Sequence, residues 1–310
     1  MDEKYEIMNL LQVKQNLTKE LNNLVYGSIE IRENSSNRYI YVHYREDGIL
    51  LTKYVGEYSD ELHNLILNNT IKAKELKKEI KKIEKQLKKL NHIDEELSPE
   101  IKKNIDFAKR HLVDNIYNQA ILEGVATTFA DTESIIEGGK INNMSSEDVL
   151  KIVNLKHAWE FILNKNVILS DTNFPLLCEI NKFIEEGFYY NAGKLRGVPV
   201  SIGGTKWAPE LPIESIIKED IQNIFNMEIN DIDKAIKLLL YVMKKQIFID
   251  GNKRTSIIFA NHYLISKGQG IIAVPANLTN EYKKLLIDYY EGKDSTEIKK
   301  FLKEKCFIQI

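Results

Sequence analysis

The stretch 246-QIFIDGNKRTS-256 separates two apolar runs at helical spacing, NDIDKAIKLLLYVMKKQ over 230–246 and KRTSIIFANHYLISKGQG over 253–270. The spacing predicts a helix on each side, so the stretch forms the loop between the end of one helix and the start of the next. The first turn of a helix leaves backbone N–H groups unpaired and carries the positive end of the helix dipole. The start of the second helix, at Gly251, Asn252 and Lys253, is therefore predicted to be an anion site.

The side chains of this loop favour phosphate as the anion. Gly251 lets the backbone approach a ligand closely, Arg254 can hold two phosphate oxygens with its fork, and Lys253 adds a point charge. Asp250 would repel phosphates unless a cation bridges them, and Mg²⁺ is typically held by one carboxylate together with substrate phosphates. The residues predict a magnesium-assisted triphosphate site without a Walker loop. DGNK alone is also an ordinary turn with a helix cap, so the surrounding motifs must decide.

Composition excludes several classes of protein. The 310 residues contain 43 basic and 45 acidic side chains, so no overall field attracts the chain to nucleic acid or membrane. Cys178 and Cys306 match no zinc, redox or disulfide pattern and are expected to be packing residues, in keeping with a reducing compartment. The N-terminal residues contain no long apolar stretch, so no membrane span or signal peptide is expected. We expect a cytoplasmic protein.

The N-terminal part differs in pattern from the rest, which predicts two domains, 1–95 and 96–310. Helical spacing over 5–24 and 60–90 predicts two helices that can pair as in a coiled coil. Between them, short alternating runs with turn residues predict a three-stranded meander: GSIEIRE, RYIYVHYRE and ILLTKYVGE. The sequence NHIDEELSPE, with Pro99, is expected to connect this module to the next domain.

The role of this N-terminal module has two interpretations. Its meander loosely resembles small three-stranded DNA-contacting modules at the start of some recombinases, which would make DNA a partner. Alternatively, it is a structural arm whose lysine-rich helix is simply solvated. Pairing of such arms across a two-fold axis would give a homodimer.

From about residue 100 onward the pattern is almost entirely helical. The exception is 195-LRGVPVSIGGTKWAPELP-212, where Val198, Val200 and Ile202 alternate before two glycines. This alternation predicts a β-hairpin that projects from a helical body.

Three motifs in this helical part resemble the Fic/Doc family. The loop matches the family signature H-x-F-x-[DE]-[GA]-N-[GK]-R at every defined position except the first, where Gln246 stands. The segment 192-AGKLRGVPVSIGGTKWAPELP-212 resembles the family's flap, and 132-TESIIEGGK-140 is similar to its IEG segment. The resemblance implies a mainly α fold, a Fic-type helical domain with a β-hairpin flap, preceded by the helix, meander, helix module.

The resemblance also implies an activity. Fic proteins transfer AMP, or another phosphate-containing group, from a nucleotide such as Mg²⁺-ATP to a Ser, Thr or Tyr hydroxyl of a target protein. By position, Asp250 would bind Mg²⁺, Gly251 and Asn252 would line the anion hole, and Arg254 would hold phosphate. Phe248 would anchor the loop in the core. The flap would bind the target chain through Val200, Ile202 and Thr205, with Trp207 either flanking the ligand or packing on the body.

Three departures from the family pattern bear on function. Gln246 occupies the position of the general base, and an amide cannot take up a proton, so transfer should be slowed by roughly 10²- to 10⁴-fold. Lys253 stands where adenylylating members usually have glycine. The lysine makes the loop resemble that of the Doc branch, whose members are protein kinase toxins. Autoinhibited members carry a glutamate that contacts a second arginine. Glu137 is our candidate for this glutamate, but Ile257 replaces the second arginine; alternatively, Gly138 simply caps a helix.

Three functions remain open from the sequence. The first is an adenylyltransferase impaired at its base. The second is a non-catalytic nucleotide-binding regulator or scaffold, and the third is a Doc-like, toxin–antitoxin-type kinase. The histidines show no metal-ligand spacing, and His262 is expected to be a packed or surface residue instead of a displaced base.

Overall fold

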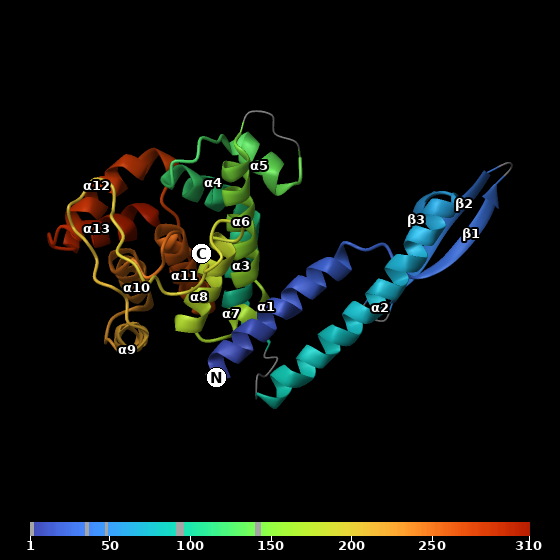
Figure 1. The fold of residues 1–310 in the computed structure, drawn as a ribbon, viewed down its shortest axis with the longest axis horizontal. Helices are drawn as coiled ribbons and strands as arrows, with labels where there is room; N and C mark the ends of the chain where they lie inside the picture. Colours follow the sequence, from blue (N-terminus) through green and yellow to red (C-terminus); the bar gives the residue numbers. More distant parts are fainter. Residues whose placement is uncertain (1–2, 35–36, 47–48, 91–95, 140–143) are drawn as a thin grey trace. The chain divides into compact units, whose positions relative to one another are not determined.

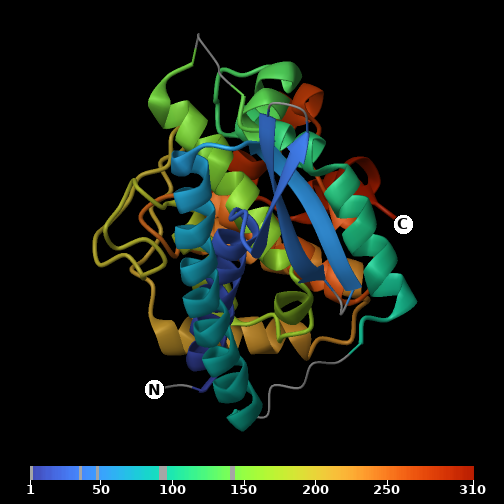
Figure 2. The same ribbon diagram turned by 90° about the vertical axis from the view of Figure 1, so that its right-hand side faces the viewer.

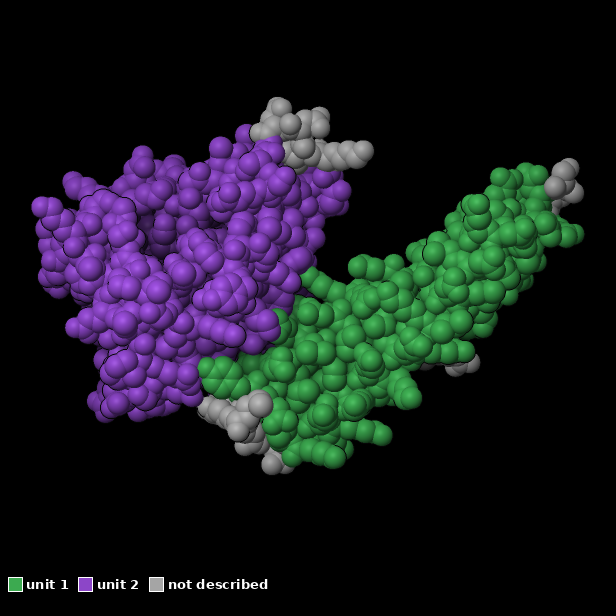
Figure 3. Space-filling view, viewed as in Figure 1, with its two compact units in different colours: residues 1–93 green, residues 94–310 purple. Residues whose placement is uncertain are grey.

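The computed structural model describes residues 3–34, 37–46, 49–90, 96–139 and 144–310. It comprises two compact units, residues 1–93 and residues 94–310 (Figure 3). The predicted boundary, after residue 95, is two residues from the boundary between these units. Residues 91–95 themselves lie outside the described residues. No helix in the described part of the chain is long and apolar enough to cross a membrane.

The first unit has the predicted order of elements. It consists of α1 (Glu3–Asn22), β1 (Ser28–Asn34), β2 (Asn37–Glu46), β3 (Ile49–Glu57) and α2 (Asp60–Lys89). The three strands form an antiparallel sheet in the order β1-β2-β3 (Figures 1 and 2). Ser59 starts α2 because its hydroxyl accepts a hydrogen bond from the Leu62 amide.

Two small apolar clusters hold this unit together. In the first, Ile40 and Val42 of the sheet pack with Ile66 of α2. In the second, Leu21 at the end of α1 packs with Ala73 and Leu76 of α2, which is the predicted pairing of the two helices. The opposite face of the sheet carries three contacting tyrosines: Tyr39, Tyr41 and Tyr54.

The second unit is helical. Its helices, in chain order, are α3 (Pro99–Arg110), α4 (Leu112–Leu122), α5 (Phe129–Ile136), α6 (Ser146–Ile162), α7 (Lys165–Ile168), α8 (Phe174–Ile184), α9 (Glu214–Phe225), α10 (Asp231–Lys245), α11 (Asn252–Ser266), α12 (Thr279–Tyr290) and α13 (Thr296–Phe301). A 3₁₀ turn (Ala276–Leu278), a π turn (Leu302–Cys306) and two short paired strands, β4 (Ile271–Ile272) and β5 (Phe307–Ile308), complete it. The sequence pattern missed α9.

Helix α11 forms the centre of this unit. All of its residues from Arg254 to Ile265 are buried, which explains why its apolar pattern runs around the whole helix. Helix α10 packs beside it, and α8 contacts both α6 and α11. The two cysteines are buried, as predicted for packing residues. The loop between α10 and α11 therefore rests on a rigid core.

The predicted hairpin at 195–212 is not formed. This segment contains no strand. A turn brings the Thr205 amide within 3.4 Å of the Ile202 carbonyl oxygen, but no ladder extends from it. Prolines at 199, 209 and 212 lack the N–H group that a ladder needs. The flap is an irregular loop.

Candidate functional site

The loop begins with a sharp reversal at Gln246. Asn230 caps the start of helix α10, because its side chain accepts a hydrogen bond from the Asp233 amide, and Gln246 is the cap residue at its end. Gln246 has a φ of 46°, the left-handed conformation, which glutamine adopts only when its surroundings hold it there. Gly251 is the cap residue before helix α11, and it has no side chain to cap the helix. The Gly251 amide donates to the Asp250 side chain, so the backbone amides that follow it in the first turn are the candidates for the predicted anion site.

Asn252 closes the loop from inside. Its Oδ1 accepts a hydrogen bond from the Phe248 amide at 3.0 Å, and its Nδ2 donates to the Phe248 carbonyl at 2.8 Å. Phe248 is buried, which agrees with its predicted anchoring role. The Asn252 side chain therefore shapes the loop, and only its backbone amide can contribute to an anion hole.

The side-chain amide of Gln246 is bound on both sides. Its Nε2 donates to the Met243 carbonyl at 2.6 Å, and its Oε1 accepts from Asn252 Nδ2 at 3.2 Å. The buried Tyr290 hydroxyl also interacts with this amide. Gln246 thus ties α10, the loop and α12 together at the position where the family signature has its base.

Asp250 presents an exposed carboxylate at the start of α11. Its side chain is 54% exposed, and its Oδ1 accepts a hydrogen bond from the Gly251 amide at 2.6 Å. Below it, Asn181 of α8 donates to the Asp250 carbonyl at 3.0 Å and to Thr255 Oγ1 at 3.1 Å. Asn181 also accepts from the Gly193 amide, so one buried amide joins the loop to the chain that leads into the flap.

Asp250 also bears on the implied magnesium. Among the residues that the structure describes, no group of three or more His, Cys, Asp and Glu could hold a metal. One exposed carboxylate beside an anion site fits Mg²⁺ that is shared with nucleotide phosphates and water. It does not fit a metal held by protein ligands alone.

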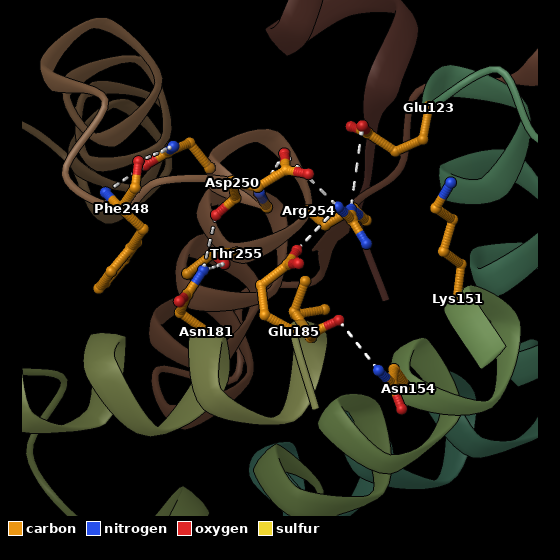
Figure 4. Close-up of polar contacts among 12 residues, drawn as sticks. Glu123, Lys151, Asn154, Asn181, Glu185, Phe248, Asp250, Arg254 and Thr255 are labelled. Atoms are coloured by element: carbon orange, nitrogen blue, oxygen red, sulfur yellow. Dashed lines mark hydrogen bonds and ion pairs between the residues drawn. The ribbon is translucent and has the colours of Figure 1, made fainter. Parts of the chain in front are cut away.

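Arg254 lies among three carboxylates (Figure 4). Its Nη2 is 2.8 Å from Glu185 Oε1 and 3.8 Å from Asp250 Oδ1, and its Nε is 3.9 Å from Glu123 Oε2. Lys253 points to the same cluster, with its Nζ 3.4 Å from Glu123 Oε1. Three carboxylates thus face two cations, and the predicted phosphate ligands are already paired with acidic residues.

Glu185 is the most deeply buried of these carboxylates, with 2% of its surface exposed. Burial raises its pKa from an ordinary 4.5 to about 7, against the lowering effect of Arg254, while Asp250 and Glu123 raise it further. Asn154 of α6 donates to the carbonyls of residues 184 and 186. This capping of α8 fixes the backbone on both sides of Glu185.

The predicted inhibitory residue lies elsewhere. Glu137 is exposed at the end of α5, where Gly138 adopts a left-handed conformation typical of a helix cap. Apart from Asp250 in the loop itself, the carboxylates that the structure places against Arg254 are Glu123 and Glu185. The sequence could have indicated Glu123 as a second candidate, because Glu123 and Gly124 form a Glu-Gly pair like that of residues 137 and 138. Nothing in the sequence marked Glu185, which reads as part of a helix end.

The flap is fastened to the loop by Arg196, which the sequence analysis did not assign to the site. This buried guanidinium donates to the carbonyls of Gln246, Val198 and Glu210, at 2.5, 2.8 and 2.6 Å. Trp207 stacks on Tyr290 with ring centroids 5.7 Å apart, so it packs on the body. Three further predicted target-binding residues are only partly buried in the flap: Val200, Ile202 and Thr205.

His262 does not reach the loop. It is fully buried in α11, where Nδ1 lies 2.8 Å from Thr172 Oγ1 and Nε2 lies 2.8 Å from the Val167 carbonyl. Burial lowers its pKa to about 4. It is a packed histidine, as expected, and cannot replace the missing base.

Comparisons with known proteins agree with this geometry. Residues 171–264, which include α8, the flap, α10 and the loop, match the Fic/DOC family model. No curated protein matches the chain. A segment of Fic-1 from C. elegans has a similar structure, with a TM-score of 0.52, 16% identity and coverage of 78% of this chain and 79% of that one.

Two bacterial structures are similar to the same extent. A Fic-domain-containing signaling protein from Bacteroides thetaiotaomicron has a TM-score of 0.52 and 18% identity, covering 68% of this chain and 86% of its own. A Fic family protein from Desulfovibrio desulfuricans has a TM-score of 0.52 and 13% identity, covering 67% and 72%. At such identities the likeness establishes the fold, and the family-model match adds the motif. The chain therefore carries a domain of the Fic/DOC family.

Proposed function

We propose that this protein binds Mg²⁺-ATP at the start of α11 and is built to transfer AMP to a Ser, Thr or Tyr hydroxyl of a target protein. The observation that carries the proposal is the uncapped N-terminus of α11, which meets the exposed carboxylate of Asp250 and the guanidinium of Arg254 in one loop. Amides and an arginine suit phosphate oxygens. When bound, Mg²⁺ would neutralise phosphate charge, with Asp250 as its protein ligand.

The residues of this chain would position the reactants more than they would move protons. Asn252 and Asn181 keep the loop in one conformation, and Arg196 keeps the flap beside it. The irregular flap backbone between Val200 and Thr205 can accept an extended target segment by strand addition. Gln246 can orient a hydroxyl through Oε1, but it cannot remove the proton. Transfer is therefore expected to be slow.

A second candidate is a nucleotide-binding regulator without catalysis. It is favoured by the two hydrogen bonds that bind the Gln246 amide to Met243 and Asn252, because an amide used in this way serves the loop instead of a substrate. The alternative of a Doc-like kinase requires the Lys253 side chain to fill part of the phosphate channel. The ammonium group of Lys253 lies toward Glu123, so this alternative has less support.

Nucleotide binding is the first property to test. Calorimetry with millimolar ATP, with and without Mg²⁺, should give weak binding that requires the metal. Arg254→Ala should abolish it, whereas Arg110→Ala, which removes an exposed arginine of α3, should not. Equal binding by the two variants would contradict the assignment of Arg254, and no binding by the native chain at any concentration would overturn both candidate functions.

The first unit keeps the two roles predicted for it, a DNA contact or a dimerising arm. Its open sheet face carries Arg32 over the Tyr41 ring, at 4.3 Å from the centroid, and such pairs suit nucleic-acid bases as well as proteins. A DNA shift assay across salt concentrations, beside sedimentation of the full chain, separates the two roles, because phosphate contacts weaken as salt rises.

A further inference from the structure

The second half of helix α2 (Figure 1) carries a high density of positive charge. Between residues 72 and 89 it has nine lysines and three glutamates. Because an α-helix has 3.6 residues per turn, eight of these lysines fall within an arc of about 140° of the helix surface. We call this arc the lysine stripe. Its residues, all of them exposed, are Lys74, Lys77, Lys78, Lys81, Lys82, Lys85, Lys88 and Lys89.

The negative charges of this part of α2 lie outside the lysine stripe. By the same helical geometry, Glu75 and Glu84 flank the stripe, and Glu79 lies farther round the helix. Glu84 Oε1 is 3.0 Å from Lys14 Nζ of α1, so this carboxylate is already paired. No lysine of the stripe forms an ion pair with a carboxylate in the described part of the chain. The stripe therefore presents positive charge alone.

This arrangement is unfavourable for the helix by itself. Lysines stand four residues apart at positions 74/78, 77/81, 78/82, 81/85 and 85/89, and like charges at this spacing destabilise a helix. A helix face that is merely solvated typically alternates the two signs of charge, as Glu147 and Lys151 do on α6. The unrelieved repulsion indicates that the stripe receives its negative charges from a ligand that carries many of them.

The shape of the stripe favours double-stranded DNA as that ligand. From Lys74 to Lys89 the stripe is roughly 22 Å long, which suits a polymer with regularly repeated charges better than a small anion. The major groove of B-DNA is about 12 Å wide and admits an α-helix. Lysines at the two edges of the stripe, Lys77 and Lys82, would then face the phosphates of opposite strands.

The apolar residues of the same segment argue against a membrane surface as the ligand. Leu76, Ile83 and Leu87 are buried on the side of α2 nearly opposite the stripe, and Ile80 is partly buried against α1. A helix that lies in a membrane surface needs an exposed apolar face beside its basic one. Residues 72–89 of α2 have no such face.

We propose that the lysine stripe of α2 binds the phosphate backbone of double-stranded DNA. The binding is independent of base sequence, because contacts to phosphate carry no sequence information directly. The contact lies on α2 and not on the tyrosine-bearing face of the sheet. It also does not depend on the nucleotide site of the second unit, so the result of ATP calorimetry has no bearing on it.

Fluorescence anisotropy of a labelled DNA duplex of about 20 base pairs, titrated with the full chain at about 50 to 200 mM salt, tests the proposal. Each phosphate that a lysine neutralises steepens the fall of log K with log[salt] by roughly 0.9. The triple variant Lys78→Gln/Lys81→Gln/Lys85→Gln should bind at least roughly tenfold more weakly, with a slope reduced by about 2.7. Its unfolding temperature should be no lower than that of the native chain, because like-charge repulsion is removed.

Two control variants separate the stripe from other cations. Lys102→Gln/Lys103→Gln/Lys109→Gln removes three exposed lysines of α3 and should bind DNA as the native chain does. Arg32→Gln, on the open face of the sheet, should do the same. Equal losses in the two triple variants would overturn the proposal in favour of a general charge effect, and a loss confined to Arg32→Gln would move the contact to the sheet.

Other results would also refute the proposal. One is the absence of DNA binding by the native chain at the lowest salt concentration, and another is an unchanged salt slope in the triple variant of the stripe. Equal affinity for an RNA duplex would exclude docking in the major groove, because that groove is deep and narrow in A-form RNA. Tighter binding to vesicles of anionic lipid than to DNA would assign the stripe to a membrane surface.

Discussion

Replacing Glu185 by glutamine should change how the stability of the protein depends on pH. The groups that face this carboxyl are Arg254 on α11, Asp250 in the loop, Glu123 at the end of α4 and Lys151 on α6. Its pKa in the folded protein, about 7, lies above its ordinary 4.5, chiefly because of burial. The folded state therefore holds the proton more tightly than the unfolded chain, and the contribution of Glu185 to stability falls as pH rises from 4.5 through 7.

The magnitude follows from that difference in proton affinity. A tenfold difference is worth about 1.4 kcal/mol, so raising the pKa from 4.5 to about 7 costs roughly 3 kcal/mol when the carboxyl is fully ionised. About 2 kcal/mol of this should develop between pH 5.5 and pH 8. Glutamine cannot ionise, so the free energy of unfolding of Glu185→Gln should rise by about that amount relative to the native chain over this range.

Urea unfolding at several pH values measures this effect. All other titrating groups are common to both proteins, so their contributions cancel in the difference. Glu186→Gln, at an exposed neighbouring position, should follow the native curve. Parallel curves for the native chain and Glu185→Gln would refute the reasoning, because they would mean that Glu185 is not buried as a titrating group beside Arg254.

Three further predictions concern other residues of the second unit. Gly251→Ala should lower the free energy of unfolding by about 1–3 kcal/mol and weaken Mg²⁺-ATP binding. The reason is that φ at this position is +73° and the new Cβ would overlap Glu185. Unchanged urea unfolding would contradict this prediction. Arg196→Ala should leave the helical circular dichroism signal unchanged and speed proteolysis within 197–213, because the carbonyls of the flap lose their hydrogen-bond donor. Protease resistance equal to that of the native chain would contradict this prediction. His262→Gln should flatten the loss of stability on acidification from pH 6.5 towards 4, where the native chain loses up to about 3 kcal/mol because the unfolded chain takes up a proton that the buried imidazole does not. An equally steep loss in the variant would exclude His262 as its cause.

Local patterns predicted the elements of this fold well. Residues at helical spacing marked α1, α2, α6, α10 and α11 to within a few residues, and turn residues between alternating runs marked the meander. The helical pattern that begins near residue 100 gave no boundaries up to residue 138, where the structure has three helices, interrupted at His111 and again before Phe129. Helix α9 was missed because its buried isoleucines stand among charged residues after a proline-rich segment.

The site was only partly predictable because sequence motifs mark the loop and not its partners. Gln246, Asp250, Gly251 and Arg254 lie together, as the motif order implied. Asn181 and Glu185 come from α8, about 65 residues earlier in the chain, and a buried carboxylate beside an arginine looks like any other glutamate at a helix end. The predicted hairpin failed for a local reason, since its prolines prevent strand pairing.

Transfer of label from ATP to protein tests most directly the claim that Gln246 silences a site built for AMP transfer. Mg²⁺-ATP labelled at the α- or the γ-phosphate would be supplied at millimolar concentration to the native chain and to Gln246→His, with cell extract as a source of targets. Only the histidine form should label protein, and only with the α-label. Equal labelling by the native chain would contradict the role given to Gln246, γ-label would favour the kinase alternative, and silence of every form would contradict the transferase account.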